Sequence, residues 1–424
     1  MPTFSDSRVL HIDITGPDRS GVTHALTSIL AQSGVRILDI GQAVIHDALA
    51  LGMLVELTDG IKASPLLTEL LLKAHELGVQ IRFSSASGAD YEAWVAGQSK
   101  GRYLVTVLGR ELTAAQLADV SGVIAAAGLN IDRIDRLSRR TSLAAPPAGA
   151  RMCVELAASG ELTSETSLRA ELLALTSRHE IDIAFQEDTP YRRHRRLVAF
   201  DMDSTLIRTE VIDELAALAG VGDEVRAVTE AAMRGELDFR ESFRRRVALL
   251  KGLPATALQQ VIDRVPLMDG AERLVGTLRQ LGYRTAILSG GFTFVGRVLQ
   301  QRLGIDYLYA NELDMRDGVV TGEVREPIVD GERKAFYLQE IARAEGLNME
   351  QVIAVGDGAN DLPMLGLAGL GIAFRAKPIV RRSARQSIST LGLDGILYLI
   401  GVRDRETIDL VEAGASAATA GRPA

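Results

Sequence analysis

Aromatic residues and cysteine are scarce in this sequence. Phe, Trp and Tyr together make up 4% of the 424 residues, although 47% of all residues are hydrophobic, so aliphatic side chains must fill the cores. The single cysteine, Cys153, excludes a disulfide within the chain and fits a reducing compartment. A chain of this length is expected to form two or three domains.

Positive net charge and long apolar runs are missing as well. The formal net charge of −8 argues against a general nucleic-acid-binding protein, because phosphate backbones require a basic surface. The basic run YRRHRR (191–196) is an exception, which we interpret as a solvated linker in preference to a binding patch. The N-terminus has no basic stretch followed by an apolar core, and no apolar run is long enough to span a bilayer. We therefore expect a soluble, cytoplasmic protein with no nucleic-acid or membrane partner.

The first part of the chain contains an internal repeat. Residues 9–40 can be laid over residues 103–134, and each copy has an alternating strand, a glycine, a helical stretch and a second strand. The helical stretch ends at Gly34 in one copy and at Gly128 in the other, as a C-terminal cap would. A further strand, an amphipathic helix and a last strand follow in both. The pattern predicts βαββαβ twice, which is a ferredoxin-like layer of sheet and helices.

The stretch GPDRSGVTHAL in the first copy resembles the ACT domain, a family of small-molecule sensors that often bind amino acids. In that family the glycine loop between strand and helix contacts the ligand, which implies effector binding at Gly16 and Asp18. The second copy reads GREL where the first reads GPDR, so its own ligand loop departs from the pattern. The alternative is that both copies are only structural or dimerising. ACT domains commonly pair between chains, which implies a homodimer.

Three buried strands in the rest of the chain end in polar residues. LVAF (197–200) is followed by Asp201 and Asp203, YRTAILSGG ends in Ser289 and two glycines, and QVIAVGD ends in Asp357. Repeated strand–helix units predict a doubly wound parallel sheet, which binds ligands at the carboxyl ends of its strands. We therefore expect these polar side chains to gather at one site.

The residues of this site suit phosphoryl transfer. Asp201, Asp203 and Asp357 are candidates for holding one Mg²⁺, a hard cation that binds carboxylate and phosphate oxygens and relieves the like-charge cost. Asp201 is suited to act as the nucleophile and form an aspartyl-phosphate, whereas Asp203 can protonate the leaving oxygen and later deprotonate water. Ser289 and the nearby glycine amides can donate hydrogen bonds to the phosphoryl oxygens, and Lys334 can neutralise charge during transfer.

The distribution of histidine and cysteine limits the nucleophile. All six histidines and Cys153 precede Arg195, so the candidate catalytic part contains neither residue type. Histidine and cysteine nucleophiles and histidine-based triads are therefore excluded there. Aspartate remains as the phosphoryl acceptor.

As a set, DMDST, SGG, the lysine of GERK and GDGAND resemble the four motifs of the haloacid dehalogenase superfamily. The DxDST form and these spacings resemble the phosphoserine phosphatases of that superfamily, over about residues 195–401. The second aspartate of DMD points to a phosphatase and away from a dehalogenase. The resemblance implies that Asp361 supports the lysine and the metal site. It also implies substrate contacts at Gly290 and Asn360, beside Ser289 and Lys334.

A mostly helical insertion, roughly residues 210–268, lies between the first two motifs and is too long for a plain crossover. We expect it to form a cap that excludes water from the site. Within it, helical spacing places Arg246 on the same inward, apolar face as Phe239 and Phe243. A partly buried arginine needs an anion, and its fork fits a carboxylate.

Glu210 could pair with an ammonium group, although an ordinary exposed glutamate is the alternative. Arg246 and Glu210 match substrate residues that the resemblance implies, as do Met233 and Phe239 on the apolar wall of the cap. A phosphate beside the metal, a carboxylate on Arg246 and an amine on Glu210 together describe phosphoserine.

The sequence therefore predicts Mg²⁺-dependent hydrolysis of O-phospho-L-serine to serine and phosphate, the last step of phosphorylated serine synthesis. The ACT pair implies feedback by an amino acid, most plausibly serine. The alternatives are a phosphotransferase of the same fold, a phosphatase for another small phosphomonoester, and an amino-acid-sensing regulator with a silent catalytic domain. We expect two ACT domains, at 8–86 and 101–188, with a linker at 88–101 between them and a surface loop at 144–149. A catalytic domain at 195–405 and a disordered tail at 411–424 follow.

Overall fold

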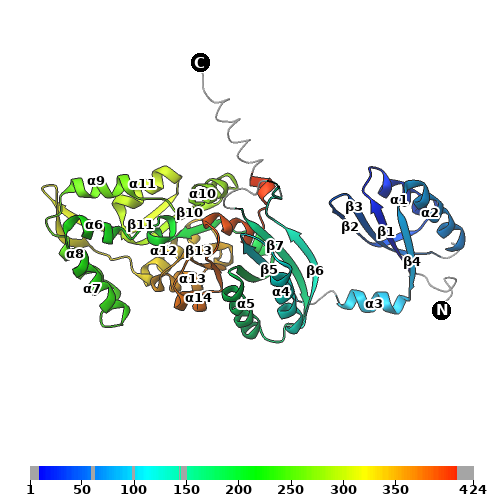
Figure 1. Ribbon diagram of the computed structural model, residues 1–424, viewed down its shortest axis with the longest axis horizontal. Helices are drawn as coiled ribbons and strands as arrows, with labels where there is room; N and C mark the ends of the chain where they lie inside the picture. The colour runs from blue at the N-terminus through cyan, green and yellow to red at the C-terminus, as the bar shows by residue number, and fades with distance from the viewer. Residues whose placement is uncertain (1–8, 59–62, 98–100, 143, 145–149, 408–424) are drawn as a thin grey trace, which may run out of the picture. The chain divides into compact units, whose positions relative to one another are not determined.

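The computed structural model describes residues 9–58, 63–97, 101–142, 144 and 150–407. Its chain divides into two compact units, residues 1–100 and residues 101–424 (Figure 1). The predicted surface loop, apart from its first residue, and the predicted tail lie outside the described residues.

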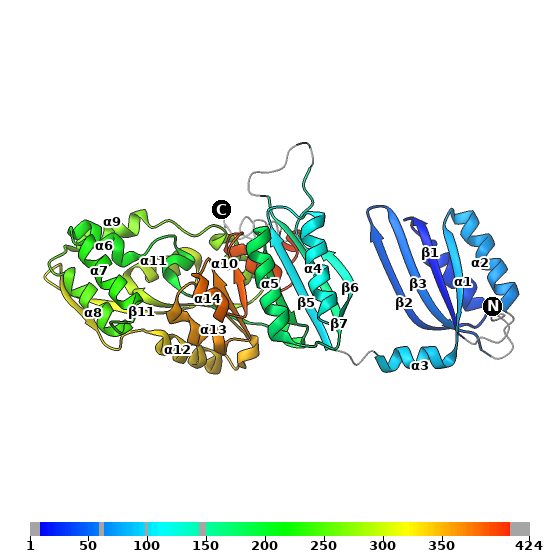
Figure 2. The ribbon, with the colours of Figure 1, turned by 60° about the horizontal axis from the view of Figure 1, so that its bottom comes forward.

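The first unit is a four-stranded antiparallel sheet with two helices, α1 and α2, on one face (Figure 2). Alternate residues of the first strand, Leu10, Ile12 and Ile14, are buried against those helices, as a period of two requires. The strand order is β2-β3-β1-β4, and the βαββαβ prediction is confirmed. The elements are β1 Val9–Pro17, α1 Val22–Gln32, β2 Arg36–Ile45, β3 Ala48–Glu56, α2 Ala63–Leu77 and β4 Gln80–Ala86.

A helix occupies most of the predicted linker. Helix α3 spans Gly88–Ala96 and begins with a capping box, in which the Ser87 hydroxyl accepts the Asp90 amide proton and the Asp90 carboxylate accepts that of Ser87. These reciprocal bonds satisfy amides that the first turn of a helix otherwise leaves free. The linker is therefore partly helical.

The second unit begins with another sheet of the same topology, ordered β6-β7-β5-β8 and covered by α4 and α5. Here too the βαββαβ prediction is confirmed. Helix α4 is followed by Gly128 in a left-handed conformation (φ 83°), which glycine adopts without strain, so the predicted cap is in place. The elements are β5 Gly101–Gly109, α4 Ala114–Ala126, β6 Leu129–Arg136, β7 Met152–Gly160, α5 Glu165–His179 and β8 Asp182–Glu187.

The rest of the second unit is a seven-stranded sheet ordered β12-β11-β10-β9-β13-β14-β15, parallel except for β12. This confirms the predicted doubly wound parallel sheet. All four residues of β9 are buried, because helices cover both faces of the sheet. The strands are β9 Leu197–Phe200, β10 Arg284–Phe292, β11 Tyr307–Arg316, β12 Val319–Arg325, β13 Val352–Gly356, β14 Leu370–Phe374 and β15 Gln386–Ile388. The helices that connect them are α10 Ala271–Gln280, α11 Thr293–Leu303, α12 Gly331–Ala344, α13 Leu362–Leu367 and α14 Pro378–Ser383, and α15 Ile396–Leu399 follows the last strand.

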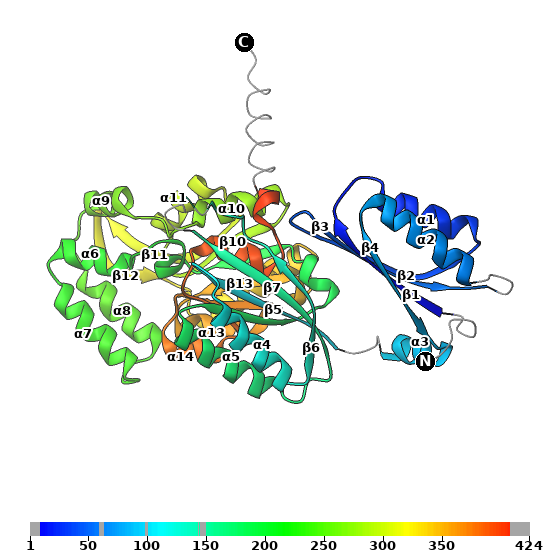
Figure 3. The same cartoon turned by 45° about the vertical axis from the view of Figure 1, so that its right-hand side comes forward.

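Four helices between β9 and α10 form the insertion, which we call the cap. They gather at the end of the second unit opposite to β5–β8 (Figures 1 and 3). At the base of the cap Ile207 pairs with Leu267, so the chain enters and leaves the cap side by side. The helices are α6 Val211–Ala219, α7 Gly222–Met233, α8 Phe239–Leu249 and α9 Ala255–Arg264.

The second βαββαβ layer is joined to the seven-stranded sheet by a polar edge contact. The Gln386 side chain of β15 accepts the main-chain amide of Phe185 (3.0 Å) and donates to the carbonyl of the same residue (2.5 Å). It thereby satisfies the free edge of β8 as a neighbouring strand would. The buried Asp182 carboxylate accepts the amides of Ser389 and Thr390 at 2.9 and 2.7 Å.

Burial strengthens the same junction. Leu108, Leu137, Cys153 and Ala184 of the second layer belong to one hydrophobic cluster with the core of the seven-stranded sheet. Arg192 and Glu155 form an ion pair across the junction and are 2% and 6% exposed. The second layer therefore shares a core with the seven-stranded sheet. No helix within the described ranges is long and apolar enough to cross a membrane.

Replacing one partner of the buried pair tests this junction. The Glu155→Gln substitution leaves the Arg192 guanidinium buried without a counter-charge, so we expect a loss of about 3 kcal/mol in the free energy of unfolding of the second unit. Urea denaturation followed by circular dichroism measures it. The matched control is Glu312→Gln, which breaks the exposed pair with Arg325 (3.0 Å) and should change the midpoint little. Equal shifts in the two variants would contradict a stabilising junction.

Candidate active site

Three adjacent strands in the middle of the seven-stranded sheet position the polar residues of the site. Strand β9 lies between β10 and β13, and all three run parallel. Asp201 follows β9, Ser289 lies near the end of β10, and Asp357 follows β13. The carboxyl ends of parallel strands meet at one edge, so the side chains that the sequence places there come together.

Lys334 is the central cation of the site. It lies in the first turns of α12 and is fully buried. Its Nζ is 2.9 Å from Oδ1 of Asp201 and 2.6 Å from Oδ1 of Asp361. Burial alone would lower the pKa of Lys334, but Asp201 and Asp361 outweigh it and raise that pKa, so the ammonium group stays charged.

The acidic residues outnumber this one cation. Burial, and then the charges of Asp201 and Asp361, raise the pKa of Asp357 to about 8. Burial, and then Glu210 and Asp201, raise the pKa of Asp203 well above its usual range. The site therefore holds more negative charge than Lys334 compensates, which favours a bound cation.

A group of three aspartates fits such a cation. Each of Asp201, Asp357 and Asp361 offers a carboxylate oxygen, and these oxygens all lie within 4.8 Å of one another. The Thr205 hydroxyl donates to Oδ1 of Asp357 (3.2 Å) and so orients that carboxylate. Hard oxygen donors in this number suit Mg²⁺. The set differs from the predicted one, because Asp361 belongs to it and the Asp203 carboxylate does not.

Asp203 faces the glycine loop of β10 instead. A Cβ on Gly291 would lie 2.4 Å from its Oδ2, so only glycine leaves room for this carboxylate. Its buried Oδ1 has no hydrogen-bond partner among the described residues. Ser289 Oγ accepts the amide proton of Gly291 (2.9 Å), so that amide is occupied while the serine hydroxyl proton remains available.

The cap contributes a cation and a further carboxylate. Arg246 is half-buried, and its buried Nε has no hydrogen-bond partner within the described part of the chain. Burial lowers the pKa of Arg246, while the charges of Glu210, Asp213 and Asp203 oppose that effect. Glu210 accepts the Ser204 hydroxyl proton at 2.7 Å; the residue is exposed, but desolvation of its carboxylate still raises its pKa. The exposed Arg244 instead pairs with Glu326 outside the cap, at 2.6 Å.

The predicted apolar wall of the cap is only half formed. Phe239 stacks on Phe243 with ring centroids 6.1 Å apart, and its Cζ would be 2.9 Å from a Cβ on Gly290. Met233 is the last residue of α7, is 66% exposed, and has its sulfur 3.8 Å from Lys377 Nζ. Met233 therefore does not share a buried wall with Phe239, because α7 ends where its side chain reaches solvent.

The remaining predicted residues divide between the two units. Asn360 is half-buried after β13, with its carbonyl oxygen 2.7 Å from where a Cβ on Gly331 would lie. In the first unit, Gly16 packs so closely on Val79 that a Cβ would come within 2.9 Å of it. The Asp18 amide donates to the carbonyl of Asp47 (2.6 Å), and its side chain is exposed.

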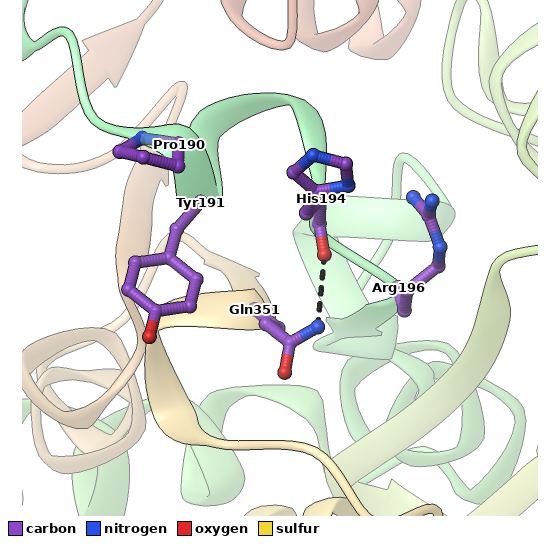
Figure 4. A pocket seen from close by; sticks show the side chains of 5 residues that line it. All are labelled: Pro190, Tyr191, His194, Arg196 and Gln351. Atoms are coloured by element: carbon purple, nitrogen blue, oxygen red, sulfur yellow. Dashed lines mark hydrogen bonds between the residues drawn. The ribbon is translucent and has the colours of Figure 1, made fainter.

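The basic run 191–196 lines a pocket of about 450 Å³ that does not include any of the predicted site residues (Figure 4). Tyr191, His194 and Arg196 surround it, and Gln351 donates from Nε2 to the carbonyl of His194 (3.1 Å). Arg192 of the run is committed to its buried ion pair. The run is thus partly structural, which differs from the fully solvated linker that the sequence predicts.

Two residues of the DMDST motif have roles that sequence reasoning missed. Thr205 orients Asp357, and Ser204 bonds to Glu210 from a left-handed backbone conformation (φ 55°) that is strained for a serine. The motif itself was the available signal, because both residues follow the two aspartates directly.

Family comparisons cover most of the chain. Residues 198–366 match the haloacid dehalogenase-like hydrolases, and residues 8–84 and 102–186 each match an ACT domain family. Phosphoserine phosphatase SerB2 of Mycobacterium tuberculosis is 41% identical over 404 residues, covering 95% of either chain. The phosphoserine phosphatase of Streptomyces coelicolor is 43% identical over 405 residues, covering 95% of this chain and 94% of the relative.

Solved structures agree with these matches. A probable phosphoserine phosphatase from Vibrio cholerae, in unliganded form, aligns with a TM-score of 0.56 and 34% identity, covering 73% of this chain and 88% of the other. A haloacid dehalogenase family hydrolase from Salmonella enterica aligns with a TM-score of 0.60 and 31% identity, covering 70% of this chain and 99% of the other.

Proposed function

The chain belongs to the phosphoserine phosphatases, which are haloacid dehalogenase-like hydrolases, and it carries two ACT domains; from this we propose how it hydrolyses O-phospho-L-serine. The proposal comprises an aspartyl-phosphate on Asp201, Mg²⁺ dependence and feedback by an amino acid. The observation that carries it is the contact of Lys334 with Asp201 and Asp361 beside a third aspartate, Asp357.

Asp201 is the proposed nucleophile. Its Oδ1 accepts the Met202 amide proton (2.7 Å) and lies 2.9 Å from Lys334 Nζ, so the carboxylate is held in one orientation at the end of β9. A carboxylate oxygen attacks the phosphorus atom, and the bond between phosphorus and the serine oxygen breaks. The Ser289 hydroxyl and Lys334 stabilise the charge on the phosphoryl oxygens.

Asp203 is the proposed acid and base. Its carboxylate lies against Gly291, in the loop that carries Ser289, and its Oδ1 has no hydrogen-bond partner in the described part of the chain. In the first step it protonates the departing serine oxygen. In the second step it takes a proton from water, whose oxygen attacks the phosphorus atom and releases phosphate from Asp201.

Mg²⁺ would be held by Asp201 and Asp357, with Asp361 in the same group of carboxylates, and Asp203 stays a predicted ligand. When bound it neutralises the like charges of these carboxylates and of the substrate phosphate. Asp361 also accepts the Gly358 amide proton at Oδ2 (2.9 Å) while its Oδ1 contacts Lys334, so its position links the metal group to the lysine.

Arg246 and Glu210 are the proposed contacts of the amino-acid part of the substrate. The buried, unpartnered Nε of Arg246 is a donor for the substrate carboxylate, and Glu210 is an acceptor for its ammonium group. A phosphotransferase would share the first step. No residue that the structure describes favours a second acceptor over water, so hydrolysis is the better supported function.

Removing Arg246 separates substrate recognition from chemistry. We expect Arg246→Ala to lower kcat/KM for phosphoserine by about 100-fold or more, because a buried charge-assisted contact is lost. For p-nitrophenyl phosphate, which has no carboxylate, kcat/KM should change only about a few-fold. The control is Arg244→Ala, since Arg244 pairs with Glu326 and should affect neither substrate strongly. Equal losses on both substrates in Arg246→Ala would refute the carboxylate contact.

The first ACT domain is the proposed effector site, with Gly16 and Asp18 as contacts. The loop is closely packed at Gly16 and leaves the Asp18 carboxylate exposed, which suits an ammonium group of a small ligand.

The first ACT domain also exposes four apolar side chains on β2, those of Ile37, Ile40, Val44 and Ile45. We propose that a second copy of the chain covers them. A monomer mass in sedimentation at a protein concentration of about 10 μM would overturn the dimer.

A fluorescence titration tests the effector site. The only tryptophan of the chain, Trp94, lies in α3 of the first unit, so its emission reports on that unit. We expect L-serine to change this emission saturably and to inhibit phosphate release with a non-competitive component. In Asp18→Ala both effects should disappear while activity without serine is unchanged. Inhibition that is purely competitive, or that survives in Asp18→Ala, would contradict the proposal.

A further inference from the structure

Asn311 lies on β11, outside the four motifs, and contacts two of the loops that build the site. The side chain is 1% exposed, and its amide is satisfied at both ends. Nδ2 donates to the carbonyl of Gly290 (2.8 Å), and Oδ1 accepts the amide proton of Val329 (2.8 Å). A buried amide with both groups paired is held in one orientation, because turning it over would break both bonds.

The first of these bonds holds an irregular part of β10. Strand β10 pairs with β11 at Leu288 and again at Phe292, with a register shift between them. The residues Ser289, Gly290 and Gly291 therefore lack regular ladder bonds to β11. The Asn311 side chain replaces one such bond, at Gly290.

The direction of the Gly290–Gly291 peptide follows from this bond. In a trans peptide the carbonyl and the following N–H point in opposite directions. Asn311 holds the Gly290 carbonyl on the β11 side, so the Gly291 N–H points the other way, where Ser289 Oγ accepts it at 2.9 Å. Gly291 also lies against the Asp203 carboxylate. Asn311 thus sets the orientation of the Ser289 hydroxyl and the wall that Asp203 faces.

The second bond reaches the loop that leads to Lys334. Val329 precedes Asp330, which caps α12 by accepting the Arg333 amide proton and also pairs with Arg240 of the cap (2.5 Å). Lys334 lies in the first turns of that helix. One side chain therefore joins the loop of Ser289 to the start of the helix of Lys334.

We propose that Asn311 is a positioning residue for phosphoryl transfer, which keeps the Ser289 loop and the Lys334 helix in register with each other. The inference rests on the proposed function, since Ser289 and Lys334 act on the phosphoryl group there. Asn311 does not touch the substrate itself.

Two substitutions of similar size separate the hydrogen bonds from the volume of the side chain. Asn311→Leu removes both bonds at every pH. Asn311→Asp keeps an acceptor for Val329 but, when ionised, turns a second acceptor toward the Gly290 carbonyl. When protonated, the carboxyl group can donate to Gly290 and accept from Val329, as the amide does. Burial raises the pKa of a carboxyl group, so protonation is accessible at mildly acidic pH.

The measurement is kcat and KM for phosphoserine between pH 5.5 and pH 8, each expressed as a ratio to the wild type at the same pH. We expect kcat of Asn311→Leu to be lower by about 100-fold throughout, with KM changed less than about threefold, because the contacts of Arg246 and Glu210 remain. In Asn311→Asp the kcat ratio should be equally low at pH 8 and rise at least about tenfold toward pH 5.5.

The ratio removes titrations that the variants share with the wild type. The charged groups around position 311 are Asp203 beyond Gly291, the pair of Asp330 and Arg240, and the pair of Glu312 and Arg325. Asn130→Asp, an exposed change on β6, is the matched control and should give a flat ratio near one.

A folded Asn311→Asp protein with a flat kcat ratio, or an Asn311→Leu protein with kcat within threefold of the wild type, would overturn the proposal. Circular dichroism at each pH establishes that the variants are folded. Wild-type turnover of phosphoserine tests the proposed function separately, so failure of the two proposals can be told apart.

Discussion

The buried contact of Lys334 with Asp201 and Asp361 is the interaction on which the site depends. A lysine without access to water keeps its charge only because two carboxylates lie within 2.9 Å of its Nζ. The same contact holds those carboxylates close to Asp357, although the three repel one another. Lys334 thus holds the proposed nucleophile and the candidate metal group together. It does not neutralise all of the carboxylates, and Mg²⁺ and Arg246 can supply the remaining positive charge.

The rest of the second unit serves this arrangement by fixing its parts from different directions. The central strands bring Asp201, Ser289 and Asp357 to one edge of the sheet, and α12 inserts Lys334 from the side. The cap adds Arg246 and Glu210, and the ion pair of Arg240 and Asp330 connects it to the N-terminus of α12. At the other end of the unit, Gln386 and the buried pair of Arg192 and Glu155 join the second ACT domain to the catalytic sheet. That domain is accordingly part of the catalytic framework, whereas the first ACT domain forms a unit of its own.

Sequence predicted those features that depend on local pattern. The alternation of the strands, the glycines that end helices and the aspartates at strand ends all act over a few residues, and the sheets and layers agree with them. Features that depend on side-chain direction were less accessible. The sequence placed Met233 beside Phe239, but the end of α7 exposes it, and it gave Asp361 only a supporting role, although its carboxylate lies in one group with those of Asp201 and Asp357. Asn311, Gln386 and Thr205 act through one or two side-chain hydrogen bonds to distant segments, for which one sequence carries no local signal.

The measurement that tests the account most directly is a rapid acid quench of the wild-type protein with ³²P-labelled phosphoserine and Mg²⁺, followed by peptide mapping. The account predicts label on the peptide that contains Asp201, formed before steady-state phosphate release, and neither label nor turnover in Asp201→Asn. Turnover retained in Asp201→Asn, or label on another residue of the chain, would contradict it.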